Sequence, residues 1–356
     1  MSKNELFFQS NDNMTNVHMI TWEPESEVLG IVHINHGVSE HVDRYDEFAK
    51  FLNSKGILVV GIDYLGHGMS TNNGNKKMYF GPEGSYKVVV ADIHHAVTQT
   101  KNRYPDVPYT MLGFSLGSFL TRTYMIDYPG IVDGAVLVGS GYISNMKYKL
   151  ARIVVNMETK KYGEDKATER VRELSFGTYN KKFKPNRTTH DWLCKSEGAV
   201  DLYLADPLRG ENLTVGLFRE LLNSMLYCSD SNNVSKMNKT KPIYFISGGD
   251  DYVGEKGKGV KKSVNLFQSC GIHDVDMKFY PTLRHAILHE LENEQVYNDI
   301  YGWLVSKNLV KPVTIQKVEQ VEKKEKDKAS GLVDYDEYDI VWPDAIKEEH
   351  SITKRK

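Results

Sequence analysis

The sequence predicts an α/β protein with a mostly parallel central sheet flanked by helices. Short β-branched runs alternate along the chain with longer segments of helical period, which is the pattern of such a sheet. The short runs are apolar almost throughout, as expected of strands that are covered on both faces. Hydrophobic residues make up 40% of the 356 positions, which is enough to bury a large core.

Six of the apolar runs are predicted to be strands of this sheet. The first 23 residues are predicted to add a pair of strands around an Asn/Asp-rich turn. Helix-starting and helix-ending residues predict helices over 43–55 and 84–103. The six predicted strands cover residues 30–36, 57–62, 109–114, 132–139, 242–247 and 275–280.

The alternation breaks between about Gly141 and Lys241, where helical patterns continue without a convincing strand. We therefore expect a helical cap over residues 141–237. This cap interrupts a core domain that we expect to comprise residues 1–140 and 238–310.

One helix of the expected cap, within residues 213–227, carries a wide apolar stripe. Leu217 and Leu221 lie on this stripe. Two interpretations stay open at this point, because the stripe either packs on the main domain or forms the wall of a binding pocket.

The composition changes again after about residue 310. Residues 311–356 are dense in charges of both signs, which predicts a solvated or loosely attached tail. The second half of this tail contains Tyr335, Tyr338 and Trp342, which suggest docking either on the body or on a partner.

The charge balance argues against a nucleic-acid binder. Lys and Arg number 45 against 47 Asp and Glu, a formal net charge of -2, whereas nucleic-acid-binding domains are markedly basic. No run approaches the ~20 apolar residues of a membrane span, and the start shows no signal-peptide pattern. We therefore expect a cytoplasmic protein without an integral membrane segment. Three widely spaced cysteines predict reduced thiols rather than a disulfide framework.

Residues 113–117, Gly-Phe-Ser-Leu-Gly, carry the strongest local signal. This G-x-S-x-G follows a predicted strand and precedes a helical run, which is the setting of a nucleophilic serine on a sharp turn. A Cβ at either flanking glycine would clash in such a turn. We predict that Ser115 is the nucleophile of an α/β-hydrolase fold.

A serine nucleophile requires a base, and the base requires a carboxylate that orients it. In this fold the chain order is serine, acid, histidine. His285 follows the last predicted strand and is the predicted base, whereas His289 is interpreted as a helix-surface histidine. The loop after 242–247 offers Asp250 and Asp251 as the acid, and spacing alone does not choose between them.

Residues 285–290, HAILHE, do not support a metal hydrolase, because they lack the H-E-x-x-H arrangement. Acyl transfer through a serine requires neither a metal nor an organic cofactor. We expect none.

An oxyanion hole requires two N–H donors aimed at the carbonyl oxygen as it becomes charged. Leu116, directly after the nucleophile, is expected to supply one backbone donor. Val38 is expected to supply the other, because Gly37 lets the chain turn inward after the strand over 30–36.

Three segments of the sequence, one of which contains the G-x-S-x-G motif, match the motifs of a known family. HGVSEH at 36–41 is followed by Arg44-Tyr45, DYLGHGMS lies at 63–70, and GFSLGS lies at 113–118. In this order they resemble the monoacylglycerol lipase and lysophospholipase branch of the α/β-hydrolases. The likeness extends from about residue 30 to 290, and the tail has no counterpart in it.

The resemblance assigns roles to individual residues. Its G-x-x-D-x-V pattern falls on residues 248–253, which selects Asp251 as the acid, and its histidine motif falls on Arg284-His285. It places the oxyanion donors at Val38 and Leu116. It also implies a cap over an acyl pocket, and Asp191-Trp192-Leu193 resembles a cap motif of bacterial members. On this basis, the residues expected to contact substrate are His36, Gly37, Leu217 and Leu221.

We therefore expect a serine ester hydrolase of the carboxylesterase or lipase type, acting on esters of apolar acyl groups. Aminopeptidase, thioesterase and perhydrolase activities use the same triad and remain alternatives. A non-catalytic binding protein on this fold is a further alternative. The expected partner is a small acyl ester, with peripheral lipid contact through the cap, and homo-oligomer formation stays open.

Overall fold

The central element of the fold is an eight-stranded sheet with the strand order β1-β2-β4-β3-β5-β6-β7-β8. The computed structural model describes residues 1–71, 74, 76–314 and 340–341. Strands β4 to β8 in this order are all parallel, and β1 and β2 join them as an antiparallel edge. The strands are β1 Ser2–Gln9, β2 Asn16–Glu23, β3 Gly30–Asn35, β4 Ile57–Ile62, β5 Tyr109–Phe114, β6 Gly134–Val138, β7 Ile243–Gly248 and β8 Val275–Tyr280.

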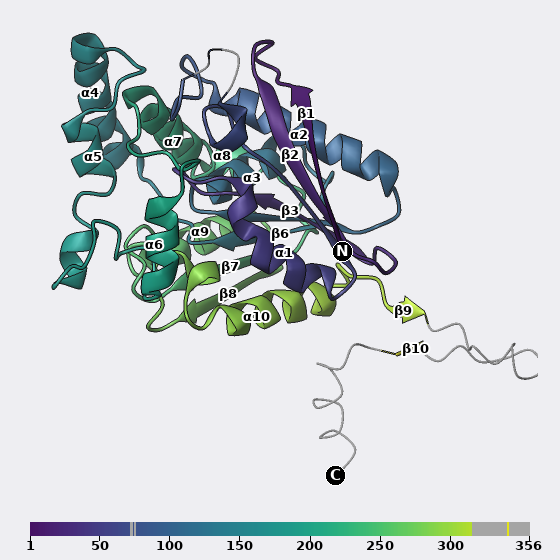
Figure 1. The fold of residues 1–356 in the computed structure, drawn as a ribbon. Coiled ribbons are helices and arrows are strands. Elements are labelled where there is room, and N and C mark those ends of the chain that lie inside the picture. The colour runs from purple at the N-terminus through teal and green to yellow at the C-terminus, as the bar shows by residue number, and fades with distance from the viewer. Residues whose placement is uncertain (72–73, 75, 315–339, 342–356) are drawn as a thin grey trace, which may run out of the picture.

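Helices cover both faces of this sheet (Figure 1). No described helix is long and apolar enough to cross a membrane. The flanking helices are α1 Asp46–Asn53, α2 Tyr86–Arg103, α3 Leu116–Asp127, α9 Lys258–Ser269 and α10 Asn293–Ser306. Short 3₁₀ turns are η1 Val42–Tyr45, η2 Gly68–Ser70, η3 Asn180–Phe183 and η4 Ile287–His289.

Successive side chains of each strand point to opposite faces of the sheet and pack in two separate hydrophobic cores. In β4, Leu58 and Val60 pack in the core shared with α2, α3 and α9. Their neighbours Ile57 and Val59 pack in the core shared with α1 and α10. This period of two, with both faces buried, explains why the strands are apolar almost throughout.

The predicted fold class is confirmed. Each predicted strand agrees with an observed one to within two residues at either end, and the first 23 residues form the antiparallel pair β1 and β2. The helix predicted over 43–55 is divided into η1 and α1, because the chain first makes a tight 3₁₀ turn after β3. The edge strand β8 is only partly buried, as expected where one side of the sheet ends.

A helical insertion lies between β6 and β7, where the alternation breaks in the sequence. Figure 1 shows α4 and α5 on its outer side and α7 nearer the sheet. Thr214 caps the start of α7 by accepting a hydrogen bond from the Leu217 N–H. The helices of the insertion are α4 Asn145–Tyr162, α5 Glu169–Ser175, α6 Glu197–Ala205, α7 Val215–Tyr227 and α8 Ser231–Val234.

Little of the expected tail falls in the described part of the chain. Two short strands, β9 Val313–Thr314 and β10 Ile340–Val341, pair antiparallel. The proposed docking aromatics Tyr335, Tyr338 and Trp342 lie outside the described residues.

The start of α3 lies unusually close to the end of β3. A Cβ built on Gly117 would lie 1.9 Å from the carbonyl oxygen of Asn35 and 2.6 Å from that of His36. Backbone atoms cannot yield as a flexible side chain can, so glycine is required at this position.

Replacing Gly117 with Ala is therefore expected to lower the free energy of unfolding by roughly 1–3 kcal/mol, the usual cost of overpacking. Gly198 in α6 is the matched control, because a Cβ there would meet nothing within 4 Å. Gly198→Ala should leave the stability unchanged or slightly higher. Urea denaturation of both variants measures the difference, and equal stabilities would contradict the close approach.

Candidate active site

Ser115 stands on the sharp turn between β5 and α3. Its backbone has φ +50° and ψ -115°, a conformation that is strained for a residue with a side chain. A Cβ on Gly113 would lie 2.5 Å from the carbonyl oxygen of Gly117, so the flanking glycines make this turn fit. Because Ser115 is the N-cap residue of α3, its hydroxyl lies where unpaired N–H groups favour negative charge.

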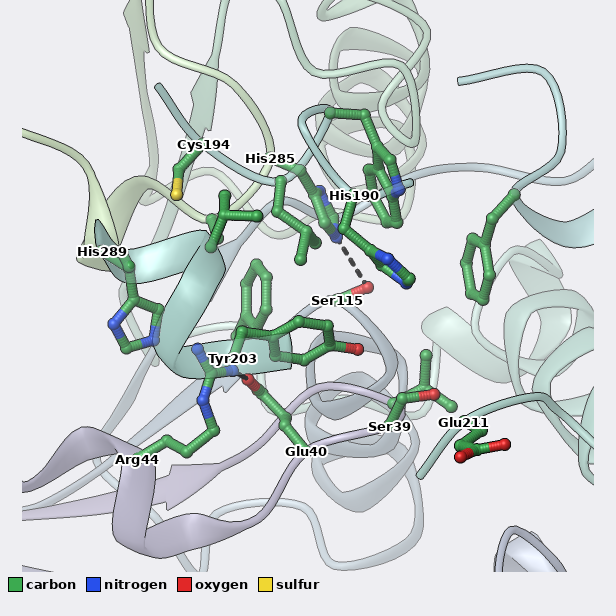
Figure 2. A pocket seen from close by; sticks show the side chains of 18 residues that line it. Ser39, Glu40, Arg44, Ser115, His190, Cys194, Tyr203, Glu211, His285 and His289 are labelled. Atoms are coloured by element: carbon green, nitrogen blue, oxygen red, sulfur yellow. Dashed lines mark hydrogen bonds and ion pairs between the residues drawn. The ribbon is translucent and has the colours of Figure 1, made fainter. Parts of the chain in front are cut away.

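His285 approaches the serine from the loop after β8. Its Nε2 lies 2.9 Å from Ser115 Oγ, which is hydrogen-bond distance (Figure 2). The imidazole packs against two aromatic rings, with centroids 4.8 Å away for Phe114 and 5.4 Å away for Trp192. Only 2% of His285 is exposed, so its orientation is fixed by its surroundings.

Asp251 is the carboxylate beside this imidazole. Its Oδ1 lies 3.0 Å from His285 Nδ1, although the contact is not aligned as a good hydrogen bond. The carboxylate also accepts hydrogen bonds from the Val253 N–H at 2.8 Å and the Ser247 hydroxyl at 3.2 Å. Catalytic hydrogen bonds are often misaligned without substrate and tighten when it binds. The three side chains thus form a continuous Ser, His, Asp arrangement.

Asp250 occupies a different environment from its neighbour. Its carboxylate pairs with Lys256 Nζ at 2.8 Å, and 40% of its side chain is exposed. Asp251 is fully buried. Spacing in the sequence left both aspartates open, and the structure brings only Asp251 next to the histidine.

The two expected oxyanion donors come from different elements near the serine. Leu116 is the first residue of α3, so its N–H has no acceptor within the helix. Val38 lies in the loop after β3 and lines the pocket together with Ser115. His36 and Gly37, which we expected to contact substrate, do not line this pocket. His36 is instead fully buried and hydrogen-bonds to the Gly37 carbonyl oxygen at 2.7 Å.

A pocket beside Ser115 and His285 is walled by both the core and the insertion. Aromatic and aliphatic groups form much of its surface, and ionisable groups face it from several sides. The lining residues discussed below are Val38, Glu40, Arg44 and His289 from the core, and His190, Trp192, Leu193, Tyr203 and Glu211 from the insertion (Figure 2).

The ionisable groups of this pocket differ in how they are compensated. Glu40 is buried and forms an ion pair with Arg44, whose guanidinium lies 4.7 Å from the ring centroid of Tyr203. Burial lowers the pKa of His190 to about 4, so this ring is neutral near pH 7. Within the described part of the chain, Glu211 forms no ion pair.

The sequence analysis did not predict three of the residues that line the pocket, and it predicted two others to line the pocket that do not. No motif marks His190, Tyr203 or Glu211, which reach the site only because the insertion folds back over it. Leu217 and Leu221, expected to wall an acyl pocket, do not line the pocket at Ser115. Leu217 is fully buried in the main core and Leu221 packs against that core, so the stripe of α7 follows the first of the two interpretations.

Hydrogen bonds connect the insertion to the loop that contains His285. The carbonyl oxygen of Leu193 accepts from the Ala286 N–H at 2.7 Å. The carboxylate of Glu290 accepts from the N–H groups of Arg284 and Lys195, both at 2.7 Å. Burial raises the pKa of Glu290 above its usual value. This segment of the insertion and the histidine loop therefore form one packed unit.

His289 is not the surface histidine that we predicted. Its ring is partly buried at the end of η4, 5.6 Å from the ring of Tyr45, and it lines the pocket. Burial lowers its pKa to about 3. Among the described residues, no three His, Cys, Asp or Glu side chains gather as a metal site would require.

Comparisons with known proteins identify relatives of this chain. The chain is 27% identical over 286 residues to a monoacylglycerol lipase of Mycolicibacterium smegmatis, a match that covers 80% of this chain and 91% of that protein. It is 25% identical over 288 residues to the monoglyceride lipase of Mus musculus, covering 80% and 84%.

Solved structures show the same fold. A thermostable carboxyl esterase from Bacillus coagulans superposes with a TM-score of 0.79 at 26% identity, covering 86% of this chain and 99% of that one. A soluble variant of the monoglyceride lipase of Saccharomyces cerevisiae superposes with a TM-score of 0.67 at 18% identity, covering 86% and 96%. Residues 26–292 match the family described as "Serine aminopeptidase, S33", and the chain therefore belongs to this family of α/β-hydrolases.

Proposed function

We propose that the protein is a serine hydrolase that cleaves carboxylic esters of apolar acyl groups through Ser115, His285 and Asp251. The observation that carries the proposal is the relay of two contacts, 2.9 Å from Ser115 Oγ to His285 Nε2 and 3.0 Å from His285 Nδ1 to Asp251. The relay opens on a pocket with a largely aromatic and aliphatic wall. Relatives that are lipases and esterases support the ester-cleaving chemistry.

In the proposed mechanism, Ser115 Oγ attacks the ester carbonyl while His285 Nε2 takes its proton. Asp251 holds the imidazole in the tautomer that carries its proton on Nδ1 and stabilises the imidazolium that forms. The tetrahedral intermediate then collapses, and His285 protonates the departing alcohol. Water then attacks the acyl-enzyme while His285 takes a proton from it, and His285 returns a proton to Ser115 Oγ when the second tetrahedral intermediate collapses. No step uses a metal or an organic cofactor.

The backbone N–H groups of Val38 and Leu116 are proposed to bind the oxyanion of both intermediates. Each such donor typically lowers the barrier by about 2.7–4 kcal/mol, because it interacts more strongly with the oxyanion than with the neutral carbonyl. The start of α3 adds the favourable field of its dipole.

An aminopeptidase is the second candidate, favoured by Glu211. This carboxylate faces the pocket without an ion pair among the described residues, so it would attract the protonated amine of a peptide substrate. Glu40 offers less attraction, because Arg44 already neutralises it. Thioesters and peroxyacids would use the same relay.

Replacing Ser115 with Ala is expected to lower kcat for p-nitrophenyl esters by about 10⁴-fold or more, because the nucleophile is lost. The wild-type protein should react with a fluorophosphonate probe and the variant should not. Assays on monoacylglycerols, lysophospholipids and aminoacyl-p-nitroanilides would rank the candidate substrates. Cleavage of anilides but not of esters would favour the aminopeptidase, and a folded wild-type protein that never labels would indicate a binding protein.

Asp251→Asn should reduce kcat by about 10⁴-fold, because the amide no longer fixes the reactive tautomer of His285. Asp250→Asn is the matched control one residue away. It removes only an exposed ion pair with Lys256, which is typically worth about 0–1 kcal/mol, so kcat should stay near wild type. A larger loss of kcat in Asp250→Asn than in Asp251→Asn would identify Asp250 as the acid instead.

We further propose that residues 141–237 act as the cap and contact lipid through α4. Four apolar side chains of this helix are exposed at helical spacing, so they form one stripe. Lys149 and Lys160 lie on the same helix and suit an anionic lipid surface. The stripe consists of Met146, Leu150, Ile153 and Met157, which are 71%, 60%, 56% and 53% exposed.

The double substitution Leu150→Glu and Ile153→Glu is expected to abolish co-sedimentation with phosphatidylserine vesicles, because it places charge in the apolar stripe. Leu291→Glu is the matched control, since Leu291 is 71% exposed but lies outside α4. Thermal unfolding would verify that both variants fold. Equal vesicle binding by the wild type and the double variant would refute lipid contact through α4.

A further inference from the structure

The backbone of Gly37 is held on both sides by buried side chains. His36 Nδ1 lies 2.7 Å from the Gly37 carbonyl oxygen, and the Gly37 N–H donates to Glu40 Oε1 at 2.5 Å. His36 is fully buried and Glu40 is 2% exposed, so solvent does not compete for these bonds. Gly37 directly precedes Val38, the residue proposed above to supply one oxyanion donor.

The hydrogen bonds of His36 determine its tautomer. The backbone N–H of Tyr64 can only donate, and it points to His36 Nε2 at 3.3 Å. Nε2 must therefore be the unprotonated nitrogen, which leaves the proton on Nδ1, where it is donated to Gly37. Burial lowers the pKa of His36 to about 3, so the ring stays neutral near pH 7. Stacking on the Tyr64 ring, at a centroid distance of 3.9 Å, fixes its plane.

Holding the Gly37 carbonyl also determines where the Val38 N–H points. The two groups belong to one planar trans peptide, in which C=O and N–H point in opposite directions. With the oxygen bound to His36, the N–H is directed to the other side of the chain, and Val38 lines the pocket at Ser115. If this peptide flipped, it would present an oxygen to the developing oxyanion.

Glu40 is itself held firmly in place. Its Oε1 also accepts from the Tyr45 hydroxyl at 2.6 Å, and its other oxygen pairs with Arg44. A Cβ on Gly37 would lie 2.9 Å from Oε1, so the carboxylate occupies the space that a side chain would need. These contacts compensate the buried charge and leave Oε1 directed at the Gly37 N–H.

We infer that His36 and Glu40 are positioning residues that set the Val38 peptide of the oxyanion hole before substrate arrives. Neither contacts the reacting atoms. They act through the backbone of Gly37, His36 on its carbonyl and Glu40 on its N–H. The inference rests on the proposed function, because an oxyanion hole matters only in acyl transfer.

Two substitutions of His36 separate this role from simple packing. The amide nitrogen of Asn superposes on Nδ1 and retains a donor for the Gly37 carbonyl, whereas the amide of Gln reaches the Nε2 position. His36→Gln should lower kcat for p-nitrophenyl butyrate by about 10²-fold with KM nearly unchanged, the signature of a lost transition-state interaction. Affinity for a boronic acid, which mimics the tetrahedral intermediate, should fall in parallel. His36→Asn should retain most of the wild-type kcat and most of the affinity for the boronic acid.

His33 provides the matched control. It is a fully buried histidine of β3, the strand that ends just before His36, with Nδ1 2.8 Å from the Tyr109 hydroxyl, and it does not line the pocket. His33→Gln should change the thermal midpoint by a similar amount to His36→Gln but leave kcat and boronic acid affinity near wild type. Equal kinetic losses in the His33 and His36 variants, or equal losses in His36→Asn and His36→Gln, would overturn the inference.

Substitutions of Glu40 provide an independent test of the inference if a His36 variant fails to fold. Glu40→Gln keeps an oxygen acceptor for the Gly37 N–H and should retain kcat to within about tenfold, whereas Glu40→Ala should lose about 10²-fold in kcat at similar KM. Indistinguishable kcat values for the two variants would overturn the inference. Wild-type protein that neither turns over esters nor labels with a fluorophosphonate would refute the proposed function instead.

Discussion

The close approach of α3 to the end of β3 is the constraint on which the site depends. Gly117 lets the helix begin where a Cβ would lie 1.9 Å from the Asn35 carbonyl oxygen. This approach brings the start of the helix, with Ser115 and the N–H of Leu116, to the loop that contains Val38. Ser115, His285, Asp251 and the proposed oxyanion donors come from separate loops, and they meet because the carboxyl ends of parallel strands share one edge of the sheet.

Much of the fold was predictable because buried parallel strands and helix ends leave local signals. The strand positions, the serine turn and the break at the insertion all follow from short segments of sequence. The choice between Asp250 and Asp251 did not follow from spacing, because adjacent residues can face solvent or the core equally well. The resemblance selected Asp251, and only the structure shows its side chain buried next to His285.

The wall of the pocket was the least predictable part, and the reason is physical. An apolar stripe on a helix indicates that this face of the helix is buried, but it does not indicate which part of the protein the face packs against. The stripe of Leu217 and Leu221 packs on the main core. Two of the side chains that face the pocket from the insertion, His190 and Glu211, lie outside its helices, and Tyr203 lies in the short helix α6. Their positions depend on tertiary contacts between segments far apart in the chain.

The bonds between the insertion and the histidine loop limit how this family member can diversify. Trp192 stacks on His285, while its neighbours Leu193 and Lys195 share hydrogen bonds with the loop of that histidine. A mutation in this short segment would alter the surroundings of His285, the proposed base, as well as the pocket. If the protein acts as proposed, changes of substrate range without loss of rate would be confined to other parts of the insertion, where Tyr203 and Glu211 line the pocket and, among the described residues, form no such bonds with the histidine loop.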